Sequence, residues 1–305
     1  MTFEEQAAAT SGAWVDTHRP IVVAVDGSER NRSALLWAAH EAVAGGELLL
    51  VTVVEDRGLP AAKFPVRSQQ QHAADMLADA QQEISHLVSD QVVRAEVTTG
   101  RPVHELLERT AGARMLVVGK RGLGGFARVI VGSTSIALAG RSPVPVTVVP
   151  DSWKQEDHVG APVVIGIDPY RPHHEPIHVA FSRARRLGVP LVAVHGWEDP
   201  TVYAWDAPAV ASASAEWEAE AHAAFDKVVD GWRAHFPDVE VRALHRHSHP
   251  AMAVLEAAEN AQIVLLGRHV DRRHGGFAFG SVTRAVLHYS ECPVTVVPSP
   301  ERDAG

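Results

Sequence analysis

The sequence predicts an α/β protein with two tandem doubly wound sheets, each with five mainly parallel strands flanked by helices. Three observations predict this fold. Short runs of Val, Ile and Leu alternate along the chain with segments whose apolar residues follow a helical i, i+3, i+4 spacing. The runs are continuously apolar, as in parallel strands that are buried on both faces. Finally, the segment 20–28 is similar to a segment that begins at Pro162, which indicates two copies of one domain.

The first copy contains five predicted strands and four predicted helices. Each strand is a short apolar run that is bounded by turn residues. Each helix shows an amphipathic face, as in Leu35, Leu36 and Ala39. Ser28 and Ser133 are the predicted N-caps of the helices that follow them. In chain order we expect strand 20–26, helix 29–44, strand 47–54, helix 68–89, strand 92–98, helix 102–111, strand 114–119, helix 133–141 and strand 144–149.

The second copy repeats this order, with helices between its strands. Its first strand lies 142 residues after that of the first copy, and its last strand lies 148 residues after, so it has gained a net six residues. We expect strands near 162–168, 190–195, 239–245, 262–267 and 293–297. The predicted organisation is a tail 1–17, a domain 18–150, a polar linker 151–160, a domain 161–299 and a tail 300–305.

Composition and charge argue against several classes of protein. The chain has 305 residues, of which 46% are hydrophobic and 21% are charged, as is ordinary for a soluble globular protein. A net charge of -9 disfavours sequence-independent binding to nucleic acid or to an anionic membrane, so we expect neither partner. The single cysteine, Cys292, fits a reducing compartment, and the N-terminus lacks the features of a signal peptide. We therefore expect a cytoplasmic protein.

A loop of glycine and hydroxyl residues follows the fourth strand of each copy. The first loop reads Gly119-Lys-Arg-Gly122, then nine residues, then Gly132-Ser133-Thr134-Ser135. The second reads Gly267-Arg-His-Val270, then nine residues, then Gly280-Ser281-Val282-Thr283. A strand, a glycine loop and a helix N-terminus in succession can bind phosphate through backbone N–H groups.

Asp26 is expected to lie beside the first of these loops. It ends the first strand, and Gly119 ends the fourth; ligands bind at the carboxyl ends of such strands, where the strand order reverses. The carboxylate can accept hydrogen bonds from an adenine amino group or a ribose hydroxyl, while Gly122 allows phosphate to approach the backbone closely. The alternative is that the glycines form tight turns and Asp26 caps a helix. The recurrence of the set in both copies favours nucleotide binding.

These motifs resemble those of the universal stress protein family. The Val-Asp26-Gly-Ser28 start, the Gly-x-x-Gly-x9-Gly-Ser loop and the Pro-Val-Thr-Val-Val endings are typical of that family, and the resemblance covers nearly the whole chain. It implies an adenine nucleotide alpha hydrolase-like fold that binds ATP, with Mg²⁺ as an optional companion. It also implies that the two domains pair through their last strands, 144–149 against 294–297, and that two chains can form a homodimer.

The resemblance also implies a role for each candidate residue. Asp26 would lie at adenine or ribose, Thr52 and Val53 would flank the base, and the loop glycines would lie at the ribose and phosphates. No catalytic and no metal-binding residues are predicted. The candidate nucleotide-binding residues are Asp26, Gly27, Ser28, Thr52, Val53, Gly119, Arg121, Gly122, Gly132, Ser133 and Thr134 in the first copy and Asp168, Gly267, Arg268, Gly280 and Ser281 in the second.

The second copy departs from the pattern at Val270, which replaces the second glycine of the loop. A β-branched residue resists positive φ and crowds a close ligand. Arg268, Arg272 and Arg273 add positive charge that can hold phosphate by another route. We expect this site to bind adenine nucleotide more weakly or in an altered pose.

Most of the 18 histidines lie after residue 150. His245, His247 and His249 alternate, so on a strand they would share a face and could bind a transition metal; a solvated strand end is the better interpretation. His173 and His174 follow the first strand of the second copy and could touch a ligand there, although an exposed helix start is the commoner role for such residues.

The leading hypothesis is an ATP-binding regulator of the stress response that acts on an unknown protein partner and hydrolyses ATP slowly or not at all. A phosphate loop is present without a recognisable triad or paired carboxylates. Two alternatives remain. One is a nucleotide-dependent enzyme that adenylates a substrate or hydrolyses ATP, because fold alone does not settle function. The other is a scaffold that nucleotide stabilises.

Overall fold

The computed structural model describes residues 14–42, 46–55, 66–88, 92–122, 131–198, 207–268 and 280–299. Each predicted strand and helix of the first copy is present, with bounds that differ by five residues or fewer. The elements are β1 (Ile21–Ala24), the 3₁₀ helix η1 (Glu29–Asn31), α2 (Arg32–Glu41), β2 (Glu47–Glu55), α3 (Val66–Ile84), β3 (Val92–Gly100), α4 (Pro102–Glu108), β4 (Met115–Gly119), α5 (Ser133–Arg141) and β5 (Val146–Val149).

The second copy follows the same order. A short 3₁₀ helix, η2 (Gln155–His158), lies in the predicted linker between the copies. The remaining elements are β6 (Val163–Gly166), α6 (His174–Leu187), β7 (Leu191–Trp197), α7 (Ala207–His235), β8 (Val241–His247), α8 (Pro250–Ala258), β9 (Ile263–Arg268), α9 (Ser281–Tyr289) and β10 (Val294–Pro298). None of the described helices is both long and apolar enough to cross a membrane.

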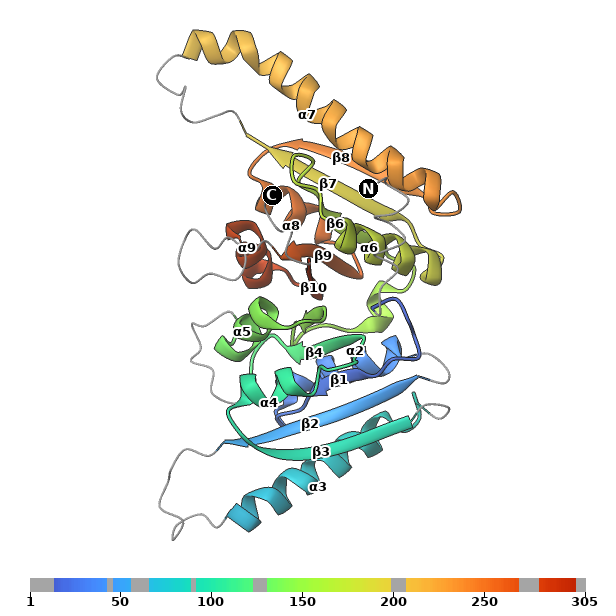
Figure 1. Cartoon of the computed structure of the whole chain (residues 1–305), viewed down its shortest axis with the longest axis vertical. Coiled ribbons are helices and arrows are strands. Elements are labelled where there is room, and N and C mark those ends of the chain that lie inside the picture. Colours follow the sequence, from blue (N-terminus) through green and yellow to red (C-terminus); the bar gives the residue numbers. More distant parts are fainter. Residues whose placement is uncertain are drawn as a thin grey trace.

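The strands form one ten-stranded sheet in the order β3-β2-β1-β4-β5-β10-β9-β6-β7-β8 (Figure 1). Within each half, all neighbouring strands are parallel. The two halves are stacked along the long axis of the molecule, and the long helices α3 and α7 lie over the outermost strands. The two predicted five-stranded sheets are therefore continuous with each other.

The central strands are apolar because both of their faces are covered. Every residue of β4 and of β5 is buried, as are the first three residues of β1. Helix α2 packs on β1, β4 and β5, and α6 packs on β6, β9 and β10. This is the burial that a continuous apolar run predicts for a parallel strand between two helical layers.

One predicted N-cap is confirmed and the other is wrong. Ser28 is the N-cap of η1, but its side chain makes no capping bond and donates instead to the Asp26 carboxylate. Ser133 is the first residue of α5, and Gly132 holds the N-cap position without a side chain. In both places the helix N-terminus has no side-chain cap, because the local side chains have other partners or are absent.

The two halves join through β5 and β10, which pair antiparallel as predicted. Val294 lies opposite Val148, Thr295 opposite Thr147, and Val296 opposite Val146. The two threonines occupy equivalent positions in the two copies, and their hydroxyl oxygens are 2.8 Å apart in a buried hydrogen bond. A pseudo-two-fold axis thus passes between the threonine side chains.

A buried ionic cluster joins α2 of the first half to α6 of the second. The Glu41 carboxylate lies 2.7 Å from Arg183 and 2.7 Å from Arg186, and Arg114 is 3.5 Å away. Arg114 also donates to the Glu41 carbonyl at the end of α2, at 3.2 Å. Burial by itself would raise the pKa of Glu41, but the three guanidinium groups outweigh it and lower the pKa to about 2. Glu41 is therefore ionised throughout the physiological range.

We expect Thr147 and Thr295 to stabilise the folded protein through their mutual hydrogen bond, so that the effects of replacing them are not additive. Thr147→Val leaves the buried Thr295 hydroxyl without its partner and should cost about 1–3 kcal/mol in the free energy of unfolding. Replacing both threonines by valine should cost less than the sum of the two single changes. Urea unfolding of both single variants and the double variant tests this. Additive losses would contradict a direct interaction across the junction.

Glu41 should make stability depend on pH in the acid range. Its pKa is lower in the folded protein than its usual value of 4.5, so its contribution is present above that value and is lost as the pH falls toward about 2. Glu41→Gln should lower the free energy of unfolding at neutral pH by about 3 kcal/mol, and this difference should shrink between about pH 5 and about pH 2. Urea unfolding across this range, with the exposed Glu259→Gln as control, measures it. A difference that did not vary with pH would contradict the assignment.

Candidate functional site

The candidate site lies at the carboxyl ends of β1 and β4, which are neighbours in the sheet. Asp26 follows β1, and its Oδ1 accepts hydrogen bonds from the Ser28 backbone N–H at 2.9 Å and the Ser28 hydroxyl at 2.7 Å. Its other oxygen faces the glycine loop, because a Cβ added at Gly122 would lie 2.6 Å from Asp26 Oδ2. The expected juxtaposition of Asp26 and the loop is present, and a side chain at position 122 would force the Asp26 carboxylate to move.

Two hydrogen bonds fix the ends of the glycine loop. The Ser135 hydroxyl donates to the Gly119 carbonyl at 2.8 Å, and the Gly132 N–H donates to the Lys120 carbonyl at 2.8 Å. These bonds hold the start of α5 against the end of β4. Because the N-cap residue Gly132 has no side chain, the first turn of α5 keeps its backbone N–H groups free of a side-chain cap. This geometry suits an anion at the helix N-terminus, where the exposed Ser133 and half-buried Thr134 lie.

Thr52 and Val53 belong to β2 and lie beside Asp26, which follows the neighbouring strand β1. The buried Thr52 hydroxyl donates to the Val25 carbonyl at 2.8 Å, one residue before Asp26. Val53 is half-buried and follows Thr52 toward the strand end. On the other side, Gly27 adopts a φ of 73° and packs against Met76 of α3. The structure thus places the predicted residues that follow β1 and those of β2 together at the carboxyl ends of the strands.

Arg121 lies next to the loop but has a partner elsewhere. Its guanidinium contacts the Asp151 carboxylate at 2.6 Å, and the Asp151 carbonyl accepts a hydrogen bond from Ser33 at 2.8 Å. This candidate nucleotide-binding residue therefore already has a partner, Asp151, at the start of the predicted linker. A phosphate at the loop would have to compete with Asp151 for this guanidinium.

In each copy, a basic residue follows the glycine near the end of β4 or β9. Its side chain donates a hydrogen bond to the other half of the molecule. Lys120 Nζ donates to the Ser290 carbonyl at 2.7 Å, and Arg268 Nη1 donates to the Ser142 carbonyl at 2.9 Å. These are equivalent bonds in opposite directions, since the two cations and the two serines occupy matching positions. Burial lowers the pKa of Lys120 and that of Arg268. Sequence reasoning placed Arg268 at phosphate and overlooked Lys120, although a cation follows the glycine in both copies.

The second copy keeps the backbone geometry of the site but changes its side chains. Asp168 Oδ1 accepts from the Tyr170 N–H at 3.0 Å, as Asp26 does from Ser28. His195 Nδ1 lies 3.2 Å from the Ile167 carbonyl, which repeats the contact of Thr52 with Val25. Tyr170 and His195 thus replace the small hydroxyl residues of the first copy. Neither was predicted, although the repeat places each of them opposite its counterpart.

Aromatic rings surround His195. The Tyr170 ring meets it edge-on with centroids 6.5 Å apart, and Phe225 of α7 stacks on it at 5.7 Å. Burial lowers the pKa of His195, so the imidazole is neutral at pH 7. In the first copy, the small Thr52 side chain leaves space beside Asp26. In the second copy, the His195 imidazole fills the equivalent space beside Asp168.

The loop of the second copy is only partly described. Gly267 lies against the His173 ring, 3.3 Å from an added Cβ, so His173 is near the crevice as expected. The Thr283 hydroxyl reaches the Gly267 carbonyl at 3.5 Å, a longer contact than its equivalent in the first copy. Gly280 is the N-cap of α9, without a side-chain cap, and Ser281 is its first residue. Val270, Arg272 and Arg273 lie outside the described residues.

The alternating histidines have separate structural roles. His245 contacts Asp226 at 3.1 Å, His247 stacks on Trp197 at 4.2 Å, and His249 accepts the Ala251 N–H at the start of α8. A different group, His104, Glu105 and Glu108 on α4, has ligand atoms within 4.8 Å of one another. Arg109 contacts the Glu105 carboxylate at 2.9 Å, so we interpret this group as a surface ion-pair network.

Comparison with known families agrees with this site. The sequence matches the model of the universal stress protein family twice, over residues 17–150 and 161–298. The chain belongs to the universal stress protein family. Membership in this family supports a role in the stress response.

Similar universal stress proteins come from mycobacteria. One from Mycolicibacterium smegmatis is 30% identical over 290 residues, covering 92% of this chain and 97% of the relative. One from Mycobacterium tuberculosis is 31% identical over 311 residues, covering 94% of this chain and 98% of the relative. The tandem arrangement thus spans nearly the full length of both relatives.

Solved structures show the same fold. A universal stress protein from Archaeoglobus fulgidus superimposes with a TM-score of 0.70 at 19% identity, covering 94% of this chain and 98% of that chain. A putative universal stress protein from Pseudomonas aeruginosa gives a TM-score of 0.65 at 15% identity, covering 94% and 95%. The ten-stranded tandem architecture therefore also occurs in distant universal stress proteins.

Proposed function

We propose that this universal stress protein binds ATP at the Asp26 site and acts as a nucleotide-dependent regulator. The contact between Asp26 and Gly122 carries the proposal, because the carboxylate occupies the space into which a side chain at position 122 would project. The loop that contains this glycine leads to a helix whose first turn has no side-chain cap. A hydrogen-bond acceptor for a nucleoside thus lies at one end of the crevice and a site for phosphate at the other.

The described residues suggest how ATP would lie. Asp26 would accept a hydrogen bond from adenine or ribose, and Val53 would contact the base, which Thr52 flanks. The phosphates would lie at the N-terminus of α5, where Ser133 and Thr134 offer backbone N–H groups and hydroxyls. Magnesium would bind the phosphates rather than a preformed protein site. Gly119 packs closely against η1, because a Cβ added there would lie 3.2 Å from the Asn31 side-chain nitrogen.

We infer that hydrolysis is slow. Among the described residues, two carboxylates lie near the loop: Asp26 accepts from Ser28 and would also be engaged by the nucleoside, and Asp151 pairs with Arg121. A general base must be free to accept a proton from the attacking water. A nucleotide that is bound and not rapidly consumed suits a sensor better than an enzyme.

Nucleotide binding would change contacts at the junction between the two halves. Lys120 lies between Gly119 and the loop and is bonded to Ser290 of the other half, while Arg121 is bonded to the linker. A phosphate that attracts Arg121 would weaken its contact with Asp151. The linker and the junction would then change together, which gives a protein partner two distinguishable states to recognise.

The second copy would bind adenine nucleotide weakly. Its base position is narrowed by His195, where the first copy has Thr52, and Tyr170 stands where the first copy has Ser28. The proposed stoichiometry is therefore one ATP per chain. This reason is independent of Val270, which was the sequence argument for the same asymmetry.

We expect the wild-type protein to bind one ATP per chain and Gly122→Ala to reduce the affinity at least about ten-fold, since its Cβ would collide with the Asp26 carboxylate. Gly280→Ala is the matched control, because an added Cβ there meets nothing within 4 Å. Isothermal titration with ATP measures both, and phosphate release measures hydrolysis. Unchanged affinity in Gly122→Ala, or rapid turnover in the wild type, would overturn the proposed site or its non-catalytic role.

Exchanging Thr52 and His195 between the copies should weaken ATP binding at the first site and strengthen it at the second. Thr52→His places an imidazole beside Asp26 and should weaken ATP binding at the first site by about ten-fold or more, through steric exclusion of the base. His195→Thr should strengthen ATP binding at the second site. Titration of each variant, with circular dichroism to confirm folding, tests the pair. Full affinity in Thr52→His would show that this position does not limit the base.

A further inference from the structure

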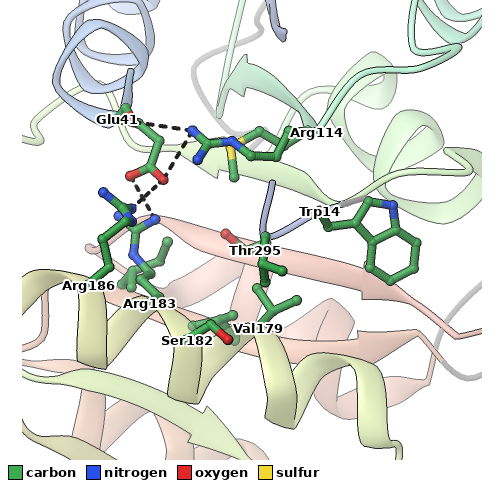
Figure 2. A pocket seen from close by; sticks show the side chains of 12 residues that line it. Trp14, Glu41, Arg114, Val179, Ser182, Arg183, Arg186 and Thr295 are labelled. Atoms are coloured by element: carbon green, nitrogen blue, oxygen red, sulfur yellow. Dashed lines mark hydrogen bonds and ion pairs between the residues drawn. The ribbon is translucent and has the colours of Figure 1, made fainter. Parts of the chain in front are cut away.

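A cavity of about 60 Å³ lies in the seam between the two halves of the molecule. It is separate from the nucleotide site, because Arg114 precedes the amino end of β4 whereas Gly119 ends that strand. Figure 2 shows the guanidinium groups gathered around Glu41 at one side, with Trp14, Val179 and Thr295 at the other. The lining residues are Trp14, Val15, Glu41, Arg114, Met115, Val179, Ser182, Arg183, Arg186, Ile263, Leu265 and Thr295.

The charges in this cavity do not balance. Three arginines, Arg114, Arg183 and Arg186, share the single carboxylate of Glu41. The next acidic group that acts on Arg114 is Asp16, and it is itself paired with Arg19 at 3.7 Å. The described charged groups of the cluster therefore carry an excess of two positive charges.

The excess positive charge is buried, which destabilises the folded protein. The Arg114 side chain is 3% exposed and that of Arg183 is 10% exposed. Burial lowers the pKa of both guanidinium groups, with Glu41 acting in the opposite direction. The Nε atoms of both arginines are buried and have no hydrogen-bond partner among the described residues. Buried cations with unused donors are destabilising unless a further anion compensates them.

The cavity has room for that anion. A space of about 60 Å³ is several times the roughly 10–15 Å³ that a cavity needs to hold one water by the same measure. The cavity is therefore of a size that suits a small oxyanion rather than a nucleotide. Arg186, whose side chain is 27% exposed, lies at the edge of the cluster and offers a route from solvent. Guanidinium groups bind such oxyanions through paired N–H donors.

We propose that this seam cavity is a binding site for a small divalent oxyanion of the phosphate class. Arg186 and Arg114 would bind the anion, while Arg183 stays with Glu41 and rests on the Trp37 ring, 5.3 Å from its centroid. The anion would neutralise the excess of two positive charges. Because Arg114 belongs to the first half and Arg186 to the second, the bound anion would hold the two halves together. The protein thereby gains a second input that is independent of ATP.

The test is a titration of the full-length protein with inorganic phosphate, against potassium chloride at equal ionic strength. We expect saturable binding of one phosphate per chain with a rise in melting temperature. Arg186→Gln should weaken binding about ten-fold or more, because it removes one charged hydrogen-bond donor group and one charge. Ser182→Val, which narrows the cavity without changing charge, should also weaken it.

Two controls separate this site from its alternatives. Arg185→Gln makes the same charge change one residue away, where the guanidinium lies over Phe236 at 4.8 Å, and should leave phosphate affinity unchanged. The phosphate titration is repeated in saturating ATP, which would occupy the nucleotide loop, and the affinity of the seam cavity for phosphate should be unchanged. The proposal is overturned if phosphate does not bind, if Arg185→Gln weakens binding as much as Arg186→Gln, or if ATP abolishes the binding.

Discussion

The antiparallel pairing of β5 with β10 is the constraint on which the rest of the structure depends. Its register places Thr147 opposite Thr295, so that equivalent residues of the two copies meet at a pseudo-two-fold axis. Two further contacts between the halves agree with this register. Lys120 reaches Ser290 and Arg268 reaches Ser142 because the same symmetry operation relates them. The pairing also covers the last strand of each copy, which would otherwise present an unpaired edge.

This symmetry explains how a duplicated site can diverge without loss of the fold. Asp26 and Asp168 accept the same backbone hydrogen bond, and Thr52 and His195 contact equivalent carbonyls. The backbone of the crevice is thus preserved in both copies. What differs is the volume of the side chains, which decides how much room is left for a base. Lys120 and Arg268, which follow the first glycine of each loop, both form hydrogen bonds across the junction and would link a ligand in one copy to the other.

The seam combines an apolar centre with a charged flank. Valines and threonines of β5 and β10 form the centre, where directional hydrogen bonds define the register. Glu41 and its three arginines lie beside it, between α2 and α6. Uncompensated charges in a buried ionic cluster are destabilising. The positive excess of the flank is therefore the basis of the anion binding proposed there, whereas the strands of the centre carry no charged side chain.

The sequence by itself determined the strands, the helices, the duplication and the juxtaposition of Asp26 with the glycine loop. These depend on local periodicity and on a repeat that aligns the two copies. Only the tertiary structure decided which partner each charged side chain takes. Arg121 and Arg268, both expected to bind nucleotide, contact Asp151 and Ser142, and Glu41 contacts Arg183 from the other half of the chain. Such partners are set by packing between distant segments, which residue type and spacing along the chain do not encode.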